Sequence, residues 1–276
     1  MRKFTPIAAA VALVSALSAV PAQADSFFWA INQFTTIQRL NGDTGAVVDS
    51  FAIPVAGGNG ASIAVVGNTG YYTKLGDTNV YGVDMTTHLS LGTQFMIPTL
   101  SGFVNGITND SNGHLWFAGG QGDPLREYST AGALLSTHAF PTASQGYRDG
   151  SVVFGNFVVT NRGDQIGPYD KYNLTGGALT LNQASFISTV GSGHNGIAYN
   201  GTNFYTSDER LHEVSKWTSA GVFVSKANLA ANSRYENWTF ASQDIVPDVP
   251  EPSTYALMFA GLALMGFAAK RKSRGA

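Results

Sequence analysis

The 276-residue chain contains no cysteine and few charged residues. The missing thiols exclude disulfides, cysteine nucleophiles, thiolate zinc sites and cysteine-ligated iron–sulfur clusters. Charged residues make up 12% of the chain, against about 25% in an ordinary soluble domain. Helical signals are also scarce, because the central part has no capped segment with a sustained 3.6-residue apolar period. Glycine (32 residues) and aromatic residues (12%) are abundant, which favours short strands joined by tight turns.

The first 24 residues have the order of a secretory signal peptide. Two basic residues precede an almost wholly apolar stretch over 7–20, and Ala22-Gln23-Ala24 has small residues at both positions that a signal peptidase reads. We expect cleavage after Ala24, with Ala22 and Ala24 as the recognition residues. Export permits disulfides, so the absence of cysteine means only that this fold requires none.

The last 28 residues, 249–276, consist of three parts in a fixed order. Pro250-Glu251-Pro252 comes first, then an apolar run of 15 residues over 255–269, then a cluster of Lys and Arg residues over 270–274. The apolar run is shorter than the roughly 17–25 residues of most membrane-spanning helices. The basic cluster is expected to keep its end on the cytoplasmic side of the membrane.

This order resembles the PEP-CTERM sorting signal of Gram-negative bacteria. The resemblance implies processing by an exosortase, a membrane-embedded cysteine protease, in a host that makes extracellular polysaccharide. It also implies a short transmembrane helix through 255–269, transient anchoring in the inner membrane, and a final place at the cell surface or outside the cell. The same tail is also labelled the ice-binding protein C-terminal domain, but the tail itself contains no ice-binding surface.

The part of the chain between the two ends is acidic. Residues 25–250 contain 10 basic and 17 acidic residues, a net charge of −7. An acidic exported domain repels nucleic acid and anionic lipid surfaces, so we expect no nucleic-acid partner. Cations, neutral glycans and basic partners are compatible with this charge.

The same central part repeats with a period near 44 residues. One marker of the repeat is a polar residue followed by glycine and an apolar run. It recurs in steps of 46, 44 and 46 residues, at Gly60, Gly106, Gly150 and Gly196, and a degenerate copy without glycine stands at Asn237-Trp238. A turn before another apolar run recurs in steps of 43, 44, 45 and 44 residues, at Gly45, His88, Gly132, Gly177 and Gly221. An apolar residue closes each unit, at Phe51, Phe95, Phe140, Phe186 and Leu229.

Four short strands in such a unit have the size of one β-propeller blade. Four complete units cover 58–97, 104–140, 148–186 and 194–229. Residues 27–53 lack an innermost strand, and 237–246 supply only an innermost strand. We therefore predict an all-β, five-bladed β-propeller over 25–248, closed by pairing of the two ends, between a signal peptide (1–24) and a sorting signal with a hydrophobic helix (249–276). A β-sandwich and an open β-solenoid with the same turns are the alternatives.

In a propeller, the loops that enter the innermost strands open onto one end of the central channel. The candidate binding residues there are polar side chains at Asn59, Asn105, Asp149, Asn195, Glu236 and Asn237. Converging oxygen ligands suit Ca²⁺, although Asn and Asp before glycine are also ordinary turn formers. The loops after the second strands add charged residues on the same face: Asp77, Asp123, Arg162, Asp164, Asp208, Glu209 and Arg210. The five histidines show no metal-ligand spacing, and only His194 lies near the expected channel mouth.

No sequence pattern assigns a catalytic residue. There is no G-x-S-x-G nucleophile turn and no phosphate-binding glycine pattern. Four aromatic residues either stack on sugars or form the core between blades: Tyr72, Trp116, Tyr147 and Tyr205. The balance favours a non-enzymatic binding or structural module at the cell envelope or in the extracellular matrix, with a glycan as partner. The alternative is a propeller hydrolase or lyase with a cation at the channel mouth and carboxylates such as Asp149 and Glu236.

Overall fold

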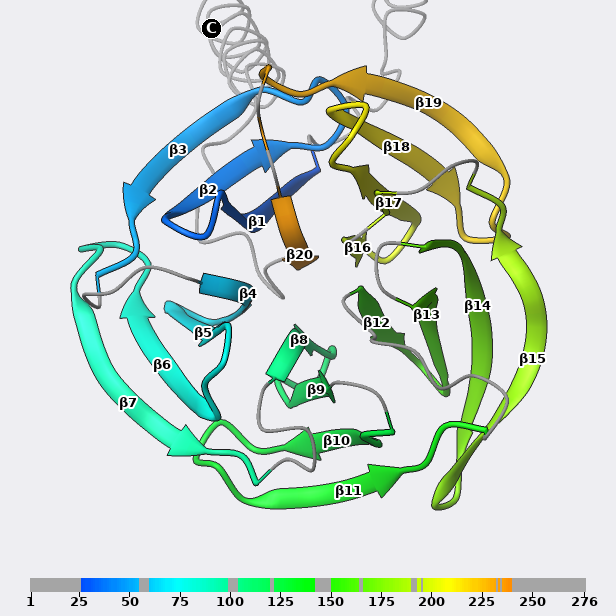
Figure 1. Cartoon of the computed structure of the whole chain (residues 1–276), viewed down its shortest axis with the longest axis horizontal. Helices are drawn as coiled ribbons and strands as arrows, with labels where there is room; N and C mark the ends of the chain where they lie inside the picture. The colour runs from blue at the N-terminus through cyan, green and yellow to red at the C-terminus, as the bar shows by residue number, and fades with distance from the viewer. Residues whose placement is uncertain are drawn as a thin grey trace, which may run out of the picture.

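The chain is folded as five sheets around one axis (Figure 1). The structure is a computed structural model that describes residues 26–54, 60–98, 104–119, 122–141, 150–163, 166–189, 193–194, 196–231, 233 and 235–239. Every regular element in these ranges is a β-strand, and the 20 strands form five four-stranded antiparallel sheets. The predicted five-bladed β-propeller is confirmed, and neither the β-sandwich nor the open solenoid applies.

Four blades consist of consecutive strands, with the first strand innermost and the last outermost. Blade 2 contains β4 (Gly60–Val66), β5 (Thr69–Lys74), β6 (Asn79–Asp84) and β7 (Ser90–Met96). Blade 3 contains β8 (Val104–Asn109), β9 (Leu115–Gly119), β10 (Leu125–Tyr128) and β11 (Leu134–His138). Blade 4 contains β12 (Ser151–Phe154), β13 (Phe157–Gly163), β14 (Ile166–Thr175) and β15 (Ala178–Ile187). Blade 5 contains β16 (Ile197–Tyr199), β17 (Asn203–Asp208), β18 (Glu213–Thr218) and β19 (Phe223–Asn228).

Blade 1 combines the two ends of the described chain. Its outer strands are β1 (Phe27–Asn32), β2 (Thr36–Asn41) and β3 (Val47–Ala52), and its innermost strand is β20 (Tyr235–Thr239). β20 runs antiparallel to β1, with Ala30 opposite Trp238. The predicted closure is confirmed, although the strand begins two residues before the expected 237–246 segment. Pairing the ends hides the edge that β1 would otherwise expose.

Side chains also connect blade 5 to blade 1. The Lys216 ammonium lies 2.6 Å from the Asp43 carboxylate, and the Asn200 amide donates to the Ser26 hydroxyl at 2.7 Å. Burial of Lys216 opposes its charge, but its interactions with Asp43 and Tyr205 together outweigh this effect and the pKa of Lys216 is raised. Within blade 1, the buried Tyr235 hydroxyl of β20 donates to Gln38 at 2.7 Å. The closure is therefore tied by polar contacts as well as by strand pairing.

The strands differ in burial according to their distance from the axis. β9 and β17 are buried along their whole length, whereas the outer strands β7 and β19 are almost wholly exposed. These inner strands show no apolar–polar alternation, since a strand covered on both faces has no solvent side to alternate with.

Apolar side chains from neighbouring blades form one core cluster at each of the five blade interfaces. Three of the aromatic residues considered for sugar stacking belong to these clusters: Tyr72, Trp116 and Tyr205. Their exposed fractions are 0%, 4% and 0%, so they are core residues. Tyr147 lies outside the described residues.

The turn glycines and the closing residues of the sequence repeat meet across these interfaces. A Cβ on Gly221 of blade 5 would lie 2.1 Å from the Phe186 carbonyl oxygen of blade 4. A Cβ on Gly132 of blade 3 would lie 2.6 Å from the Phe95 Cβ of blade 2. The two sequence markers therefore recur once per blade because they contact each other between successive blades.

Blade 2 makes the equivalent contact without glycine. His88 occupies the turn position, adopts a positive φ of 60° and stacks on Phe51 of blade 1 with ring centroids 3.9 Å apart. A flat imidazole ring therefore replaces the close approach that glycine permits at Gly45, Gly132 and Gly221.

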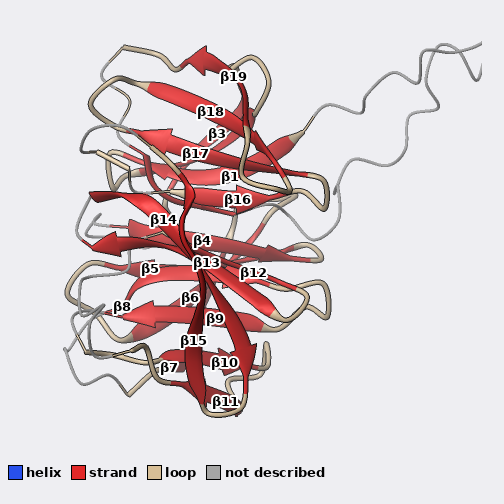
Figure 2. Ribbon diagram, turned by 90° about the vertical axis from the view of Figure 1, so that its right-hand side faces the viewer, coloured by secondary structure: helices blue, strands red, loops and turns tan. Residues whose placement is uncertain are grey.

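The antiparallel order divides the loops between two faces of the ring, which Figure 2 shows edge-on. We call the face with the loops into the innermost strands the mouth face, and the face with the first-to-second and third-to-fourth strand turns the hairpin face. Figure 1 looks onto the mouth face. β20 ends and β1 begins on the hairpin face, because β20 is a first strand and β1 a second strand.

Candidate functional site

The sorting and cleavage residues of the sequence analysis lie outside the described residues; these are Ala22, Ala24, Pro250, Glu251 and Pro252. So do three channel-mouth candidates, Asn59, Asp149 and Asn195. The other three, Asn105, Glu236 and Asn237, belong to the innermost strands β8 and β20, close to their mouth-face ends. Their backbone positions are described but their side chains are not, so the calcium site remains a prediction.

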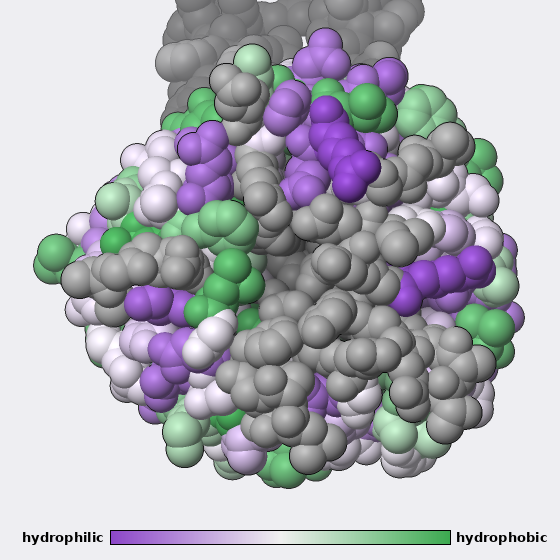
Figure 3. Space-filling model, in the orientation of Figure 1, coloured by the Kyte–Doolittle hydropathy of each residue, from purple (hydrophilic) through white to green (hydrophobic). Residues whose placement is uncertain are grey.

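The charged residues of the loops between the second and third strands lie at separate places on the mouth face and do not form one cluster. In Figure 3, hydrophilic side chains form separate patches, the darkest of them over blades 4 and 5. In blade 4, the Arg162 guanidinium makes two hydrogen bonds to Asp170, at 2.9 and 2.8 Å. Asp164 lies outside the described residues.

Blade 2 shows the same local pairing. The Tyr81 hydroxyl donates to the Asp77 carboxylate at 2.5 Å, and the Asn79 backbone N–H donates at 2.9 Å. Partial burial of Asp77 opposes ionisation, but these hydrogen bonds outweigh it and the pKa of Asp77 is lowered. Asp77 is therefore held as a carboxylate by its own blade.

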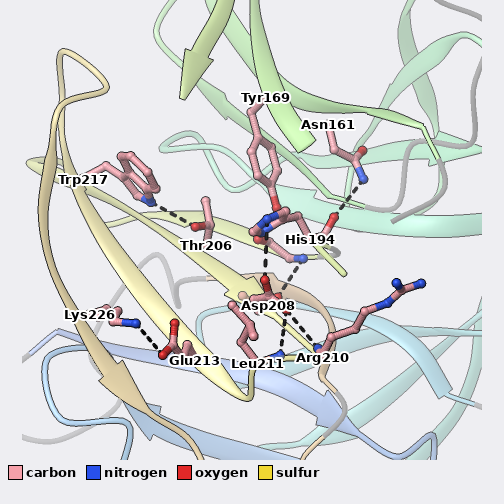
Figure 4. A network of polar contacts seen from close by, with 12 residues as sticks. Asn161, Tyr169, His194, Thr206, Asp208, Arg210, Leu211, Glu213, Trp217 and Lys226 are labelled. Atoms are coloured by element: carbon pink, nitrogen blue, oxygen red, sulfur yellow. Dashed lines mark hydrogen bonds and ion pairs between the residues drawn. The ribbon is translucent and has the colours of Figure 1, made fainter. Parts of the chain in front are cut away.

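His194 and Asp208 form a buried polar site on the mouth face, where blades 4 and 5 meet (Figure 4). Asp208 ends β17, and its Oδ1 accepts hydrogen bonds from the backbone N–H groups of Arg210 and Leu211, both at 2.9 Å. Its Oδ2 lies 3.6 Å from His194 Nε2. Gly193 permits this approach, because with φ at 121° it lies where a Cβ would be 2.9 Å from the same carboxylate.

Blade 4 reaches across to this site. The Asn161 amide donates to the His194 carbonyl at 3.3 Å, and the Tyr169 hydroxyl donates to the Gly196 carbonyl at 2.8 Å. The Gly196 N–H in turn donates to the Ser207 hydroxyl at 2.9 Å. The loop into the innermost strand of blade 5 is thus held by hydrogen bonds from two blades.

A histidine beside a carboxylate can serve general acid–base chemistry. Here the two side chains are 7% and 8% exposed, and one carboxylate oxygen already accepts two backbone amides. The arrangement therefore orients the loop and joins blades 4 and 5. His194 is therefore a buried structural residue, and its pairing with Asp208 was not predicted.

A second polar cluster lies on the hairpin face of blade 3 and was missed by the sequence analysis. Asp110, His114 and Glu127 each place one nitrogen or oxygen atom within 4.8 Å of the others. Among the described residues, this is the only group of three His, Asp or Glu side chains with metal-ligand proximity. Its residues are brought together by the register of three strands, which their spacing in sequence does not reveal.

Comparison with known proteins bears first on the tail. Residues 248–272 match the family described as the PEP-CTERM protein-sorting motif. The chain carries a PEP-CTERM sorting signal. This PEP-CTERM signal implies an exported protein that an exosortase sorts, in transit through the membrane to the cell surface. Within the described residues, no helix is long and apolar enough to cross a membrane.

Comparison of the chain with solved structures bears on the ring. A protein of unknown function from Bacteroides caccae is 13% identical, with a TM-score of 0.52 and coverage of 80% of this chain and 100% of that one. A nidogen/laminin complex chain is 14% identical, with a TM-score of 0.54 and the same coverages. These similarities show the fold alone. A search of curated protein sequences found no significant match.

Proposed function

We propose that this protein is an exported propeller that an exosortase-like enzyme releases to the cell surface or the extracellular polysaccharide matrix of a Gram-negative host. There the ring acts as a binding or structural module, with a glycan as its partner. Signal peptidase removes residues 1–24, residues 25–248 form the mature domain, and the tail over 249–276 anchors the protein in the inner membrane until it is processed.

The observation that carries this proposal is the position of the ring between the two signals. The first strand begins at Phe27 and the last ends at Thr239, whereas the matched sorting motif begins at residue 248. Removal of both terminal segments therefore leaves all five blades complete. A protein that is cleaved at both ends during delivery has to keep its folded domain intact in this way.

The composition of the ring supports a neutral, hydrated partner. Its net charge of −7 disfavours anionic surfaces, and its outer strands expose apolar side chains such as Met96, Leu134 and Phe223, which are 64%, 56% and 51% exposed. Sugars present both apolar faces and hydroxyl groups to such a surface. A matrix glycan therefore suits this ring better than a nucleic acid or an anionic membrane.

Replacing Pro250-Glu251-Pro252 by three alanines tests the delivery. We expect the variant to be exported but retained in the membrane fraction, because the exosortase no longer reads its motif. The measurement is the share of protein in the membrane, periplasmic and culture fractions of the native host. Ser253→Ala with Thr254→Ala is the matched control and should be released like the parent. Equal release of the motif variant would contradict the proposal.

The binding role is tested with the released protein on an array of neutral and acidic polysaccharides, with and without calcium. We expect retention on neutral glycans. Loss of that retention on calcium chelation would support the predicted cation at the channel mouth, and absence of any glycan retention would contradict the binding role.

A further inference from the structure

Three strands of blade 3 bring two carboxylates and one imidazole together on the hairpin face. Asp110 follows β8, His114 directly precedes β9, and Glu127 lies in β10. Glu127 is in register with Trp116 of β9 and with Ser136 of β11, so these side chains share one face of the blade. The backbone of the three inner strands, β8, β9 and β10, therefore fixes the positions of the Cα atoms that carry the three side chains.

The polar atoms of the three groups converge. His114 Nδ1 lies 2.6 Å from Glu127 Oε1 and 3.7 Å from Asp110 Oδ2. The imidazole side chain is 37% exposed, whereas the Asp110 and Glu127 side chains are 10% and 16% exposed. Solvent thus reaches the cluster through His114, while the two carboxylates are largely enclosed.

Further hydrogen bonds orient both carboxylates. The Trp116 indole donates to Asp110 Oδ2 at 3.0 Å, and the other Asp110 oxygen accepts the backbone N–H groups of Asn112 and His114, both at 2.9 Å. The Ser136 hydroxyl donates to Glu127 Oε2 at 2.6 Å, which leaves Oε1 directed at His114. Such outer hydrogen bonds hold metal ligands in place in known metal sites.

The charges of the cluster are not balanced. Two carboxylates lie within 4.8 Å of a shared imidazole. Among the described residues, no Lys or Arg forms an ion pair with Asp110 or Glu127; the arginine of the same strand, Arg126, is paired with Asp123 at 3.7 Å. A divalent cation bound between the three groups would neutralise the two carboxylates.

We infer that Asp110, His114 and Glu127 form a binding site for a divalent transition-metal ion of the Zn²⁺ class. One imidazole nitrogen and two carboxylate oxygens are ligands that Zn²⁺ accepts, and a site with three protein ligands leaves the fourth position to water or to a ligand. Ca²⁺ is disfavoured because it takes six to eight oxygen ligands. This site is distinct from the calcium predicted at the channel mouth, since it lies on the opposite face of the ring.

Binding requires only small side-chain movements. Ligand bonds of about 2.0–2.1 Å in a tetrahedral arrangement separate neighbouring ligand atoms by about 3.3 Å. His114 Nδ1 has to move away from Glu127, from 2.6 Å, and toward Asp110, from 3.7 Å. A single rotation of the exposed imidazole away from Glu127 and toward Asp110 serves both changes, and the two carboxylates keep their outer hydrogen bonds.

The test uses the full exported chain, purified in detergent without a histidine tag and stripped of metal with EDTA. Titration calorimetry with Zn²⁺ should show one equivalent bound per chain, and Co²⁺ should give the visible absorption of a tetrahedral site. His114→Ala and Glu127→Gln should each weaken Zn²⁺ binding at least about tenfold. Both variants should melt in EDTA at the same temperature as the parent, which separates lost binding from lost folding.

His88→Ala is the matched control. His88 is similarly exposed, at 34%, but has one carboxylate beside it, Asp49 at 3.5 Å, instead of two. It should leave Zn²⁺ binding unchanged. The inference is overturned if the parent binds no stoichiometric Zn²⁺, if His88→Ala loses as much affinity as His114→Ala, or if an equal concentration of Ca²⁺ displaces the Zn²⁺.

Discussion

A chain that ends at residue 234 should have no cooperative thermal transition. Such a chain lacks β20, so blade 1 loses its innermost strand and β1 loses its antiparallel partner. It also loses Tyr235, a fully buried side chain at the interface with blade 5. An open ring exposes apolar surface on both sides of the gap, and its unpaired strand is a site for aggregation.

The control is a chain that ends at residue 247, directly before the matched sorting motif. It retains β20 and should melt like the full chain. Circular dichroism during heating measures both transitions. A cooperative transition at the same temperature for the two truncations would show that β20 does not close the ring.

Gly221→Ala should lower the melting temperature far more than Gly176→Ala. Both glycines occupy turns before outer strands and have similar positive φ values, 76° and 72°. A Cβ on Gly221 would lie 2.1 Å from the Phe186 carbonyl oxygen, whereas a Cβ on Gly176 meets nothing within 4 Å. The left-handed conformation costs about 1–2 kcal/mol in either variant, but only Gly221→Ala must also move the backbone of the neighbouring blade.

The displaced backbone adds about 1–3 kcal/mol. At about 2–4 °C per kcal/mol in a domain of this size, we expect a decrease of roughly 4–20 °C for Gly221→Ala and roughly 2–8 °C for Gly176→Ala. Differential scanning calorimetry on the two variants measures the difference. Equal decreases would mean that the close approach between blades 4 and 5 does not contribute to the effect. Glycine would then be needed at this turn only for its positive φ.

The number of blades was predictable from sequence because two independent markers have the same period. The structure gives the physical reason: the turn residue of one blade touches the closing residue of the previous one, as Gly221 touches Phe186 and His88 touches Phe51. A marker that records a contact between neighbours has to recur once per blade. The closure was predictable for a related reason, since the incomplete units at the two ends complement each other.

The polar sites were less predictable. The Asp110–His114–Glu127 cluster depends on which residues of β8, β9 and β10 lie side by side, and strand register cannot be read from spacing along the chain. His194 and Asp208 were both recognised as mouth-face residues, but their pairing depends on the path of the loop at Gly193. Of the two roles left open for the aromatic residues, Tyr72, Trp116 and Tyr205 have the core role, because aromatic residues in inner strands pack at the interfaces between blades.

The two ends of the chain form one blade and thereby close the ring that lies between the two delivery signals. Because the chain has no cysteine, a double variant with Ala30→Cys and Trp238→Cys contains the only two thiols. These positions are opposite each other in β1 and β20, where Cα atoms of about 4.5–5.5 Å separation permit a disulfide. Mild oxidation of the purified monomer, followed by intact-mass and peptide analysis, should find an intramolecular bond between the two ends in most molecules. The control pair Ala30→Cys with Ala118→Cys, in blades 1 and 3, should remain reduced; equal cross-linking of both pairs, or only intermolecular bonds in the first, would contradict the account.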